Sequence, residues 1–235
     1  MWNTVNKIEE NILVEKINES TFQILTKDNI KRGKIILNNS EIAIETKYLS
    51  YIKGDIKVIN SKEQTKLNGI KDIVFNNRKL LSKHNKTILQ GSGEVYLEET
   101  DEVLILIELI DEEIIIWDDI FYSCEGEIQI EEFTEKVFIF NEDEYDEKLM
   151  LSLKGEGLVL LKLPIKNEGF LIKTKILKDT LFANNNYVIL RNNNIKYNIE
   201  KFIDSEINVY KGTGELWHIP YKKICLNNFN NQNDE

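Results

Sequence analysis

Three Gly-x-Gly triplets, each followed at once by an apolar run, recur along the chain. The run after the first triplet reads Glu-Val-Tyr-Leu, and the run after the third reads Glu-Leu-Trp. Such runs bounded by glycine are typical of β-strands. Successive triplets lie about 60 residues apart, within the reach of a multi-strand repeat unit. The pattern therefore predicts about three related β units, with triplet glycines at Gly91, Gly93, Gly155, Gly157, Gly212 and Gly214.

A polar turn that leads into a strand is the second recurring pattern. One copy occupies residues 124–133 with Gly126 at its turn, and another occupies residues 192–202. A shorter early copy has Gly54 at its turn. Glycine adopts the positive φ that tight corners and bulges need. Gly54, Gly126 and the six triplet glycines are therefore predicted to be structural turns.

The blocks follow one another without a linker. The chain has only 2 prolines and 11 glycines among 235 residues, and no stretch is enriched in either. Domain boundaries normally fall in exposed linkers of that kind. We therefore expect one continuous domain over residues 1–235, with internal repeats near residues 20–75, 86–140 and 150–220.

The hydropathy pattern favours strands over helices. Residues 41–45 alternate polar and apolar side chains, which indicates a strand with one buried face. Residues 103–107 and 137–140 are apolar without alternation. Both faces of such strands must be covered, by a second sheet, by another segment or by a neighbouring subunit. Further strands of about five residues are expected at residues 22–26, 34–37 and 56–59.

Helical periodicity is weak throughout the chain. The two best candidates for helices are residues 70–81 and residues 142–151. Since most segments have the strand pattern and turn residues separate them, the sequence predicts an all-β sandwich or barrel.

The charge balance argues against nucleic acid as a partner. The chain carries 40 acidic and 30 basic residues, for a formal net charge of −10. Phosphate affinity needs clustered Lys and Arg. A lysine-rich stretch at residues 162–178 is the exception, and on alternating strands it is expected to form a solvated face.

The chain carries no targeting or membrane signal that we recognise. Its first residues mix charges throughout and lack the apolar core of a signal peptide. No run approaches the roughly 18 apolar residues that a membrane span needs. Cys124 and Cys225 are too few for a disulfide framework, so we expect reduced thiols in a cytoplasmic protein.

These motifs, in this order and spacing, resemble the family of altered inheritance of mitochondria protein 24. The matching stretches are residues 91–133, 155–202 and 212–219, with residues 42–59 as the first block. The resemblance covers nearly the whole chain except its two ends. It implies a fold like that of the tryptophan RNA-binding attenuation protein (TRAP), a double-stranded β-helix or β-sandwich, and a tendency to self-associate. It supplies no catalytic residue for this chain.

The Gly-x-Gly triplets do not indicate a phosphate-binding loop. Such a loop places its glycines before a helix N-terminus, where free N–H groups meet the anion. Here each triplet leads into a β run, and neither GxGxxG nor GxxxxGK[ST] occurs. We interpret the triplets as structural corners.

Candidate catalytic and metal-binding groups are few. His84 and His218 form no H-x-H pair, and each is expected at the surface or a pocket edge. Cys124 lies beside carboxylates, which raise a thiol pKa and disfavour a nucleophile. Acidic clusters lack EF-hand spacing and are expected in solvated turns; they occur at residues 98–99, 101–102, 111–113, 118–119, 131–132 and 142–147.

Aromatic side chains on the expected strands are interpreted as core or interface groups and not as a ligand platform. They are Tyr96, Trp117, Phe121, Tyr122 and Trp217.

The sequence predicts a non-catalytic β scaffold that acts as a homo-oligomer or by binding a protein partner, without cofactor or metal. A carrier of a small apolar ligand, with a cavity lined by Leu, Ile and Phe, is the alternative. A hydrolase using carboxylates or a metal is the third hypothesis, and RNA binding is the fourth.

Overall fold

The computed structural model describes residues 3–4, 11–15, 20–59, 86–139, 144–183 and 188–219. They form one antiparallel sheet of 14 strands with three single-turn 3-10 helices. The all-β class predicted from the sequence is confirmed. In chain order the elements are β1 (Asn3–Thr4), β2 (Asn11–Glu15), β3 (Ser20–Lys27), β4 (Ile30–Glu45), η1 (Thr46–Tyr48), β5 (Leu49–Ile59), β6 (Lys86–Thr100), β7 (Val103–Trp117), η2 (Asp118–Ile120), β8 (Phe121–Glu125), β9 (Gln129–Ile139), β10 (Glu144–Leu163), η3 (Glu168–Phe170), β11 (Ile172–Ala183), β12 (Val188–Asn192), β13 (Ile195–Phe202) and β14 (Ser205–His218).

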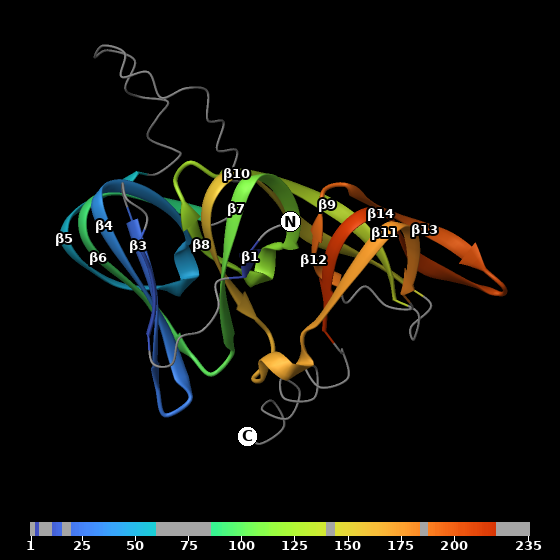
Figure 1. Cartoon of the computed structure of the whole chain (residues 1–235), viewed down its shortest axis with the longest axis horizontal. Coiled ribbons are helices and arrows are strands. Elements are labelled where there is room, and N and C mark those ends of the chain that lie inside the picture. The colour runs from blue at the N-terminus through green and yellow to red at the C-terminus, as the bar shows by residue number, and fades with distance from the viewer. Residues whose placement is uncertain are drawn as a thin grey trace, which may run out of the picture.

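The sheet is branched because its long strands change partners along their length. The main order is β11-β14-β12-β7-β10-β8-β4-β3-β2, and β1, β5, β6, β9 and β13 pair beside this path. Strand β10, for example, pairs with β9, then with β7, and with β8 near its end. In Figure 1 the strands curl strongly, with β3–β6 at one end of the molecule, β7 and β10 in the middle, and β11, β13 and β14 at the other end.

The main strands are longer than predicted, because they continue through bulges instead of ending there. The two strands expected at residues 34–37 and 41–45 are parts of β4, which is 16 residues long. Its pairing with β6 shifts register between Leu37 and Ser40. Asn39 adopts φ 53° at this bulge. A bulge bends a strand without ending its ladder, so a polar interruption in the sequence did not mark a strand end.

The prediction of a helix at residues 142–151 is wrong for residues 144–151, the part that the structure describes. Residues from Glu144 onward belong to β10, whose 20 residues reach Leu163. Residues 144–154 pair with β9 over its whole length. The Glu, Lys, Leu and Met of this segment favour a helix locally, but pairing with β9 and β7 overrides that preference. The other helix candidate, residues 70–81, lies outside the described residues.

Strand β7 is covered on both faces over residues 103–107, as its unbroken apolar run predicted. Leu104 and Leu106 of β7 belong to a core cluster with Leu89 and Tyr122. Ile105 and its neighbours on the opposite face belong to a second cluster that contains Trp217. Both covering layers come from this chain. The middle of the molecule is therefore a double-faced core, and the prediction of two buried faces for residues 103–107 is confirmed.

A third, smaller core lies under β11–β14. Ile176, Ile195 and Tyr210 are its buried members, together with Val188 and Leu216. Val137 and Phe138 of β9 are also buried, 1% and 2% exposed. The apolar run at residues 137–140 is thus covered on both faces as far as the structure describes it.

Candidate functional site

Each Gly-x-Gly triplet lies in the middle of a long strand and faces a bulge on the neighbouring strand. β6 faces β4, β10 faces β7, and β14 faces β11, and all three pairs shift register at the triplet. One non-glycine residue with positive φ occupies each bulge: Asn39 (53°), Asp111 (51°) and Lys178 (55°). The six triplet glycines have φ between 134° and 155°. The three places where a triplet faces a bulge, here called the corners, are therefore built alike.

Close backbone approach explains why glycine is required at the first position of the first and third triplets. A Cβ on Gly91 would lie 2.1 Å from the carbonyl O of Asp55, and one on Gly212 would lie 2.3 Å from that of Asn194. Both distances are far inside van der Waals contact. Gly54 also has positive φ, 119°. Gly126 lies in the turn between β8 and β9.

The middle residue of two triplets holds the facing bulge. The Ser92 hydroxyl accepts a hydrogen bond from Asn39 N at 2.9 Å. The Thr213 hydroxyl accepts one from Lys178 N at 3.0 Å. A bulge leaves an N–H without its ladder partner, and these hydroxyls satisfy it. The middle triplet carries Glu156 at this position.

Two turns dock on the strand of the preceding unit through one backbone hydrogen bond each. Gly126 N donates to the carbonyl O of Glu41 at 2.8 Å, and Asn193 N donates to that of Glu113 at 3.0 Å. Each donor is the central residue of a polar turn recognised in the sequence. The two turns thus make the same contact with successive units.

The residue before each turn reinforces this contact with its side chain. Glu125 Oε2 accepts from Leu158 N at 2.7 Å, and Asn192 Oδ1 accepts from Glu215 N at 2.7 Å. Leu158 and Glu215 both directly follow a triplet. Glu125 is 8% exposed, and its other oxygen accepts from the Ser20 hydroxyl at 2.8 Å. These carboxylate and amide groups connect the corners.

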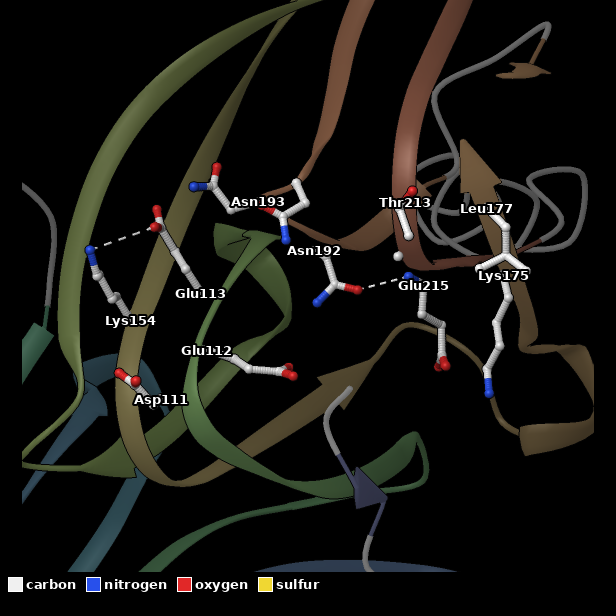
Figure 2. Close-up of a pocket in the computed structure, with 12 residues that line it drawn as sticks. Asp111, Glu112, Glu113, Lys154, Lys175, Leu177, Asn192, Asn193, Thr213 and Glu215 are labelled. Carbon is white, nitrogen blue, oxygen red and sulfur yellow. Dashed lines mark hydrogen bonds and ion pairs between the residues drawn. The ribbon is translucent and has the colours of Figure 1, made fainter. Parts of the chain in front are cut away.

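A polar pocket of about 470 Å³ lies where the second and third corners meet (Figure 2). Its walls come from the β7 bulge, β10, β11, the β12–β13 turn and the β14 triplet. In Figure 2, Lys154 points toward Glu113 on one side, and Asn192 points toward Glu215 on the other. The lining residues are Asp111, Glu112, Glu113, Lys154, Lys175, Leu177, Asn192, Asn193, Asn194, Thr213, Gly214 and Glu215.

Charged and polar side chains dominate the lining of this pocket. Four carboxylates, two ammonium groups, three amides and one hydroxyl line it, with no His or Cys. The Ser152 hydroxyl donates to Glu113 Oε1 at 2.7 Å. The Trp217 indole donates to Glu215 Oε1 at 2.7 Å. Two of the four carboxylates thus already accept hydrogen bonds from neighbouring side chains.

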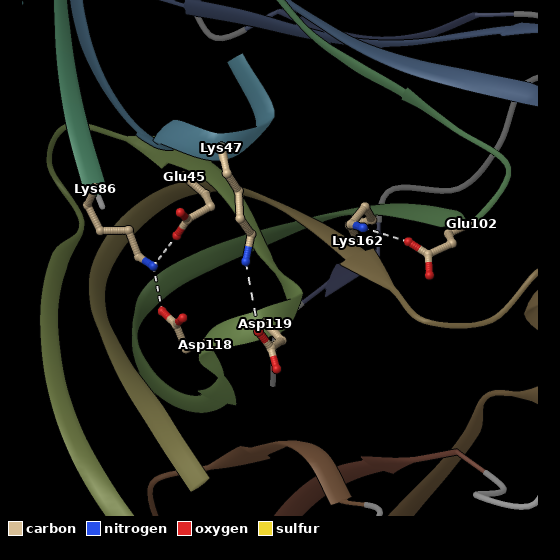
Figure 3. A network of polar contacts seen from close by, with 7 residues as sticks. All are labelled: Glu45, Lys47, Lys86, Glu102, Asp118, Asp119 and Lys162. Carbon is tan, nitrogen blue, oxygen red and sulfur yellow. Dashed lines mark hydrogen bonds and ion pairs between the residues drawn. The ribbon is translucent and has the colours of Figure 1, made fainter. Parts of the chain in front are cut away.

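A buried ion cluster lies at the junction of β4, β6 and η2 (Figure 3). Lys86 Nζ lies 2.5 Å from Glu45 Oε2 and 2.5 Å from Asp118 Oδ1, and only 1% of the Lys86 side chain is exposed. Burial by itself lowers the pKa of Lys86, but the hydrogen bonds to Asp118 and Glu45 together leave that pKa above its usual value. The ammonium group also lies 5.2 Å from the Phe121 ring. The cluster holds β4, β6 and η2 together, with Lys86 and Glu45 buried and the Asp118 side chain 14% exposed.

Two further lysines lie near this cluster in Figure 3. Lys162 Nζ contacts Glu102 Oε2 at 2.6 Å and the Tyr48 ring at 4.5 Å. Lys47 Nζ lies 3.8 Å from Asp119 Oδ1 in an exposed pair. The lysines of residues 162–178 do not form one solvated face, because Lys162 is paired in this half-buried setting.

The acidic clusters of the sequence mostly end in ion pairs and hydrogen bonds. Glu99 pairs with Arg32 at 2.7 Å, and Asp101 pairs with Lys166 at 2.6 Å. In the described ranges, no group of three or more His, Cys, Asp and Glu side chains could hold a metal ion.

The structure places the remaining candidate groups apart from one another. Cys124 is fully buried in the main core and forms no disulfide with another described residue. His218 is half-buried, and burial lowers its pKa. His84 and Cys225 lie outside the described residues. Two serine hydroxyls donate to carboxylates in the described residues, Ser20 to Glu125 and Ser152 to Glu113.

The expected aromatic residues are mostly core groups. Phe121, Tyr122 and Trp217 are at most 1% exposed, and Trp117 packs against the main core. Tyr96 differs, since its ring stacks on the exposed Tyr51 at a centroid distance of 4.3 Å.

A polar network that the sequence did not predict connects β9 to β12, β13 and β14. The guanidinium of Arg191 donates to both carboxylate oxygens of Glu135, at 3.0 and 2.6 Å, and Arg191 is 4% exposed. Tyr197 OH donates to Asn208 Oδ1 at 2.6 Å. The one sequence signal was a charged residue, Arg191, directly after the apolar run of residues 188–190.

Together, the curled antiparallel sheet and its three similar glycine corners define the chain as an all-β protein. The family model described as Mitochondrial biogenesis AIM24 matches residues 22–219, and the chain belongs to this family. The resemblance drawn from the Gly-x-Gly blocks is confirmed, whereas its TRAP-like detail stays a prediction.

Several solved chains match this chain, and one of them resembles it over most of its length. It is protein SPYM3_0169 from Streptococcus pyogenes, with a TM-score of 0.59 and 17% identity, covering 86% of this chain and 93% of that chain. At this identity the likeness concerns the fold alone. No curated protein matches the chain. Among the described residues, no helix has the length and apolar character that crossing a membrane requires.

Proposed function

We propose that this chain is a non-catalytic β scaffold that works by associating with itself or with a protein partner in the cytoplasm. One observation carries the proposal: end strands of the sheet expose large apolar side chains. Tyr51 of β5 is 46% exposed, and Phe182 of β11 is 52% exposed. Long edge strands with exposed apolar groups are templates for pairing with another chain.

Other roles gain less support from the site. The pocket of Figure 2 is lined by charged and amide groups with Leu177 as its one aliphatic side chain, so it does not favour the carrier of an apolar ligand. Many cations contact carboxylates, as Lys34 and Lys53 do with Glu94. Such pairing, with the net charge of −10, disfavours nucleic acid as the partner.

Sedimentation velocity and light scattering over a micromolar concentration series test this function. We expect a mass above that of one chain, or a stable complex with a protein that co-purifies from the native host. A strictly monomeric protein that binds no other protein would contradict the proposal. Salt-sensitive retention on an oligonucleotide resin would instead favour RNA binding.

A further inference from the structure

Two strand pairings between successive units have the same register. β4 pairs with β8 through Ala43 and Cys124. β7 pairs with β12 through Ile115 and Arg191. Both pairings are antiparallel and three residues long. Both end at the turn contacts described above, in which Gly126 and Asn193 donate to the preceding unit.

Strand β5 occupies in the first unit the position that β8 and β12 occupy in the next two. Its Ile52 pairs with Val95 of the triplet strand, as Cys124 pairs with Val159 and Arg191 with Leu216. The pairing then skips one residue in each unit. After the skipped residue, Leu49 pairs with Leu97 in the first unit, Phe121 pairs with Leu161 in the second, and Val188 pairs with His218 in the third.

Strand β11 likewise occupies in the third unit the position of β4 and β7. Its bulge residue Lys178 corresponds to Asn39 and Asp111. Counting from the bulge, Phe182 corresponds to Ala43 and Ile115. The second half of β11 is therefore equivalent to the two segments that receive β8 and β12.

In the described part of the chain, β5 and the second half of β11 both lack the neighbouring strand that their equivalents in the other units have. There, β5 pairs only with β6, and β11 only with β14. The exposed fractions reflect the missing neighbours. Phe182 is 52% exposed, against 4% for Ala43 and 8% for Ile115. All five residues of β8 are buried, whereas Tyr51 of β5 is 46% exposed.

Resting on the proposed self-association, we propose that β11 of one copy pairs with β5 of the next copy, repeating the pairing between units within the chain. Phe182 then lies opposite Ile52 of the next copy, and the carbonyl O of Thr180 accepts a hydrogen bond from Gly54 N. The two segments lie at opposite ends of the molecule (Figure 1). The contact is therefore head-to-tail, and it builds a ring or a filament according to whether its rotation closes.

The surfaces fit a second copy better than an unrelated protein. A three-residue strand pairing and a turn contact recur between units within the chain. At one end of the molecule, β11 offers the segment that receives this pairing, and at the other end β5 offers the segment that supplies it. Lysines protect the first half of β11, at Lys173, Lys175 and Lys178, but residues 179–183 carry none. Lysine is a common device against edge pairing. The unprotected half is the one that the repeat assigns to pairing.

Disulfide trapping tests this register directly. Opposed antiparallel residues have Cα atoms about 4.5–5.5 Å apart, within the range of a disulfide. Tagged Ile52→Cys and untagged Phe182→Cys chains are co-expressed in a Cys225→Ser background, where Cys124 stays buried. Mild oxidation is expected to link a tagged to an untagged chain. Replacing Phe182→Cys by Leu177→Cys, on the other side of the bulge, is expected to abolish the link.

The outcomes separate this inference from the proposed function. A wild-type oligomer without the Ile52–Phe182 link, or a Phe182→Cys chain that links to itself, overturns the head-to-tail pairing and leaves self-association standing. A wild-type monomer at every concentration overturns both. An equal yield of the Leu177→Cys link also overturns the register.

A charge on the edge gives an independent measurement. Phe182→Glu places a carboxylate in the pairing segment and is expected to weaken association by about tenfold or more, as loss of a central interface group does. Leu177→Glu is the matched control, because Leu177 is 77% exposed on the same strand but lies outside the pairing segment. Equal effects of the two variants on sedimentation would contradict the proposal.

Discussion

The side chain of Asn208 acts as a strand partner for Phe138. Asn208 Nδ2 donates to the carbonyl O of Phe138 at 2.8 Å, and Asn208 Oδ1 accepts from Phe138 N at 3.1 Å. Strands β9 and β14 are not paired by backbone hydrogen bonds, so one amide replaces a rung of the ladder. Asn208 is fully buried, which makes this contact a specific attachment of β9 to the third unit.

Asn208→Leu is expected to lower the free energy of unfolding by about 2–4 kcal/mol, because it leaves a buried N–H and a buried C=O without partners. Urea denaturation measures this change. Asn198→Leu on the exposed face of neighbouring β13 is the control, and it should change stability by less than about 0.5 kcal/mol. Similar values for the two variants would show that the amide does not hold β9.

The Arg191–Glu135 pair should show strong coupling. Removing one partner of a buried ion pair costs about 3–5 kcal/mol, since the other charge stays buried without compensation. Arg191→Leu is therefore expected to be more destabilising than the double variant Arg191→Leu/Glu135→Leu. A double-mutant cycle in urea measures the coupling, and additive effects would contradict the bidentate contact.

The glycine corners could be anticipated from the sequence, but the bulges that face them could not. Glycine at a positive φ has a local cause that a sequence pattern can express. The bulge residues Asn39, Asp111 and Lys178 share no side-chain type, and Lys rarely adopts positive φ. Their conformation follows from the facing triplet strand, which lies 34 or more positions away. Residues 34–45 therefore resembled two short strands and not one bent strand.

The polar network escaped prediction for a similar reason. Arg191 and Glu135 are 56 positions apart, and Asn208 and Phe138 are 70 apart. A charged or amide group within an apolar strand indicates that a partner exists, but alternation alone does not identify it. The two buried faces of residues 103–107, by contrast, depend only on the local pattern, and that prediction was confirmed.

Replacing a triplet glycine by alanine should destabilise the protein more where the backbone is more crowded around the new Cβ. A Cβ on Gly91 meets a carbonyl O at 2.1 Å, whereas one on Gly155 meets its nearest atom at 3.1 Å. Both positions have positive φ, so each variant carries about 1–3 kcal/mol of backbone strain. Thermal unfolding should rank Gly91→Ala well below Gly155→Ala. Gly169→Ala, near only the Asn167 side chain, is the control that should stay close to wild type.

The Lys86 cluster should make stability depend on alkaline pH. Because folding raises the pKa of Lys86 above its usual 10.5, its ion pairs contribute fully below pH 10.5 and are lost as pH rises through the higher folded-state pKa. Urea unfolding between about pH 8 and 11.5 measures this loss. Lys86→Met should cost about 3–5 kcal/mol at the lower pH and flatten the alkaline fall. Lys47→Met removes an exposed ion pair, so it should cost at most about 1 kcal/mol and leave the alkaline loss of stability unchanged. If Lys86→Met lost stability with rising pH as steeply as the wild type does, the loss would belong to other groups.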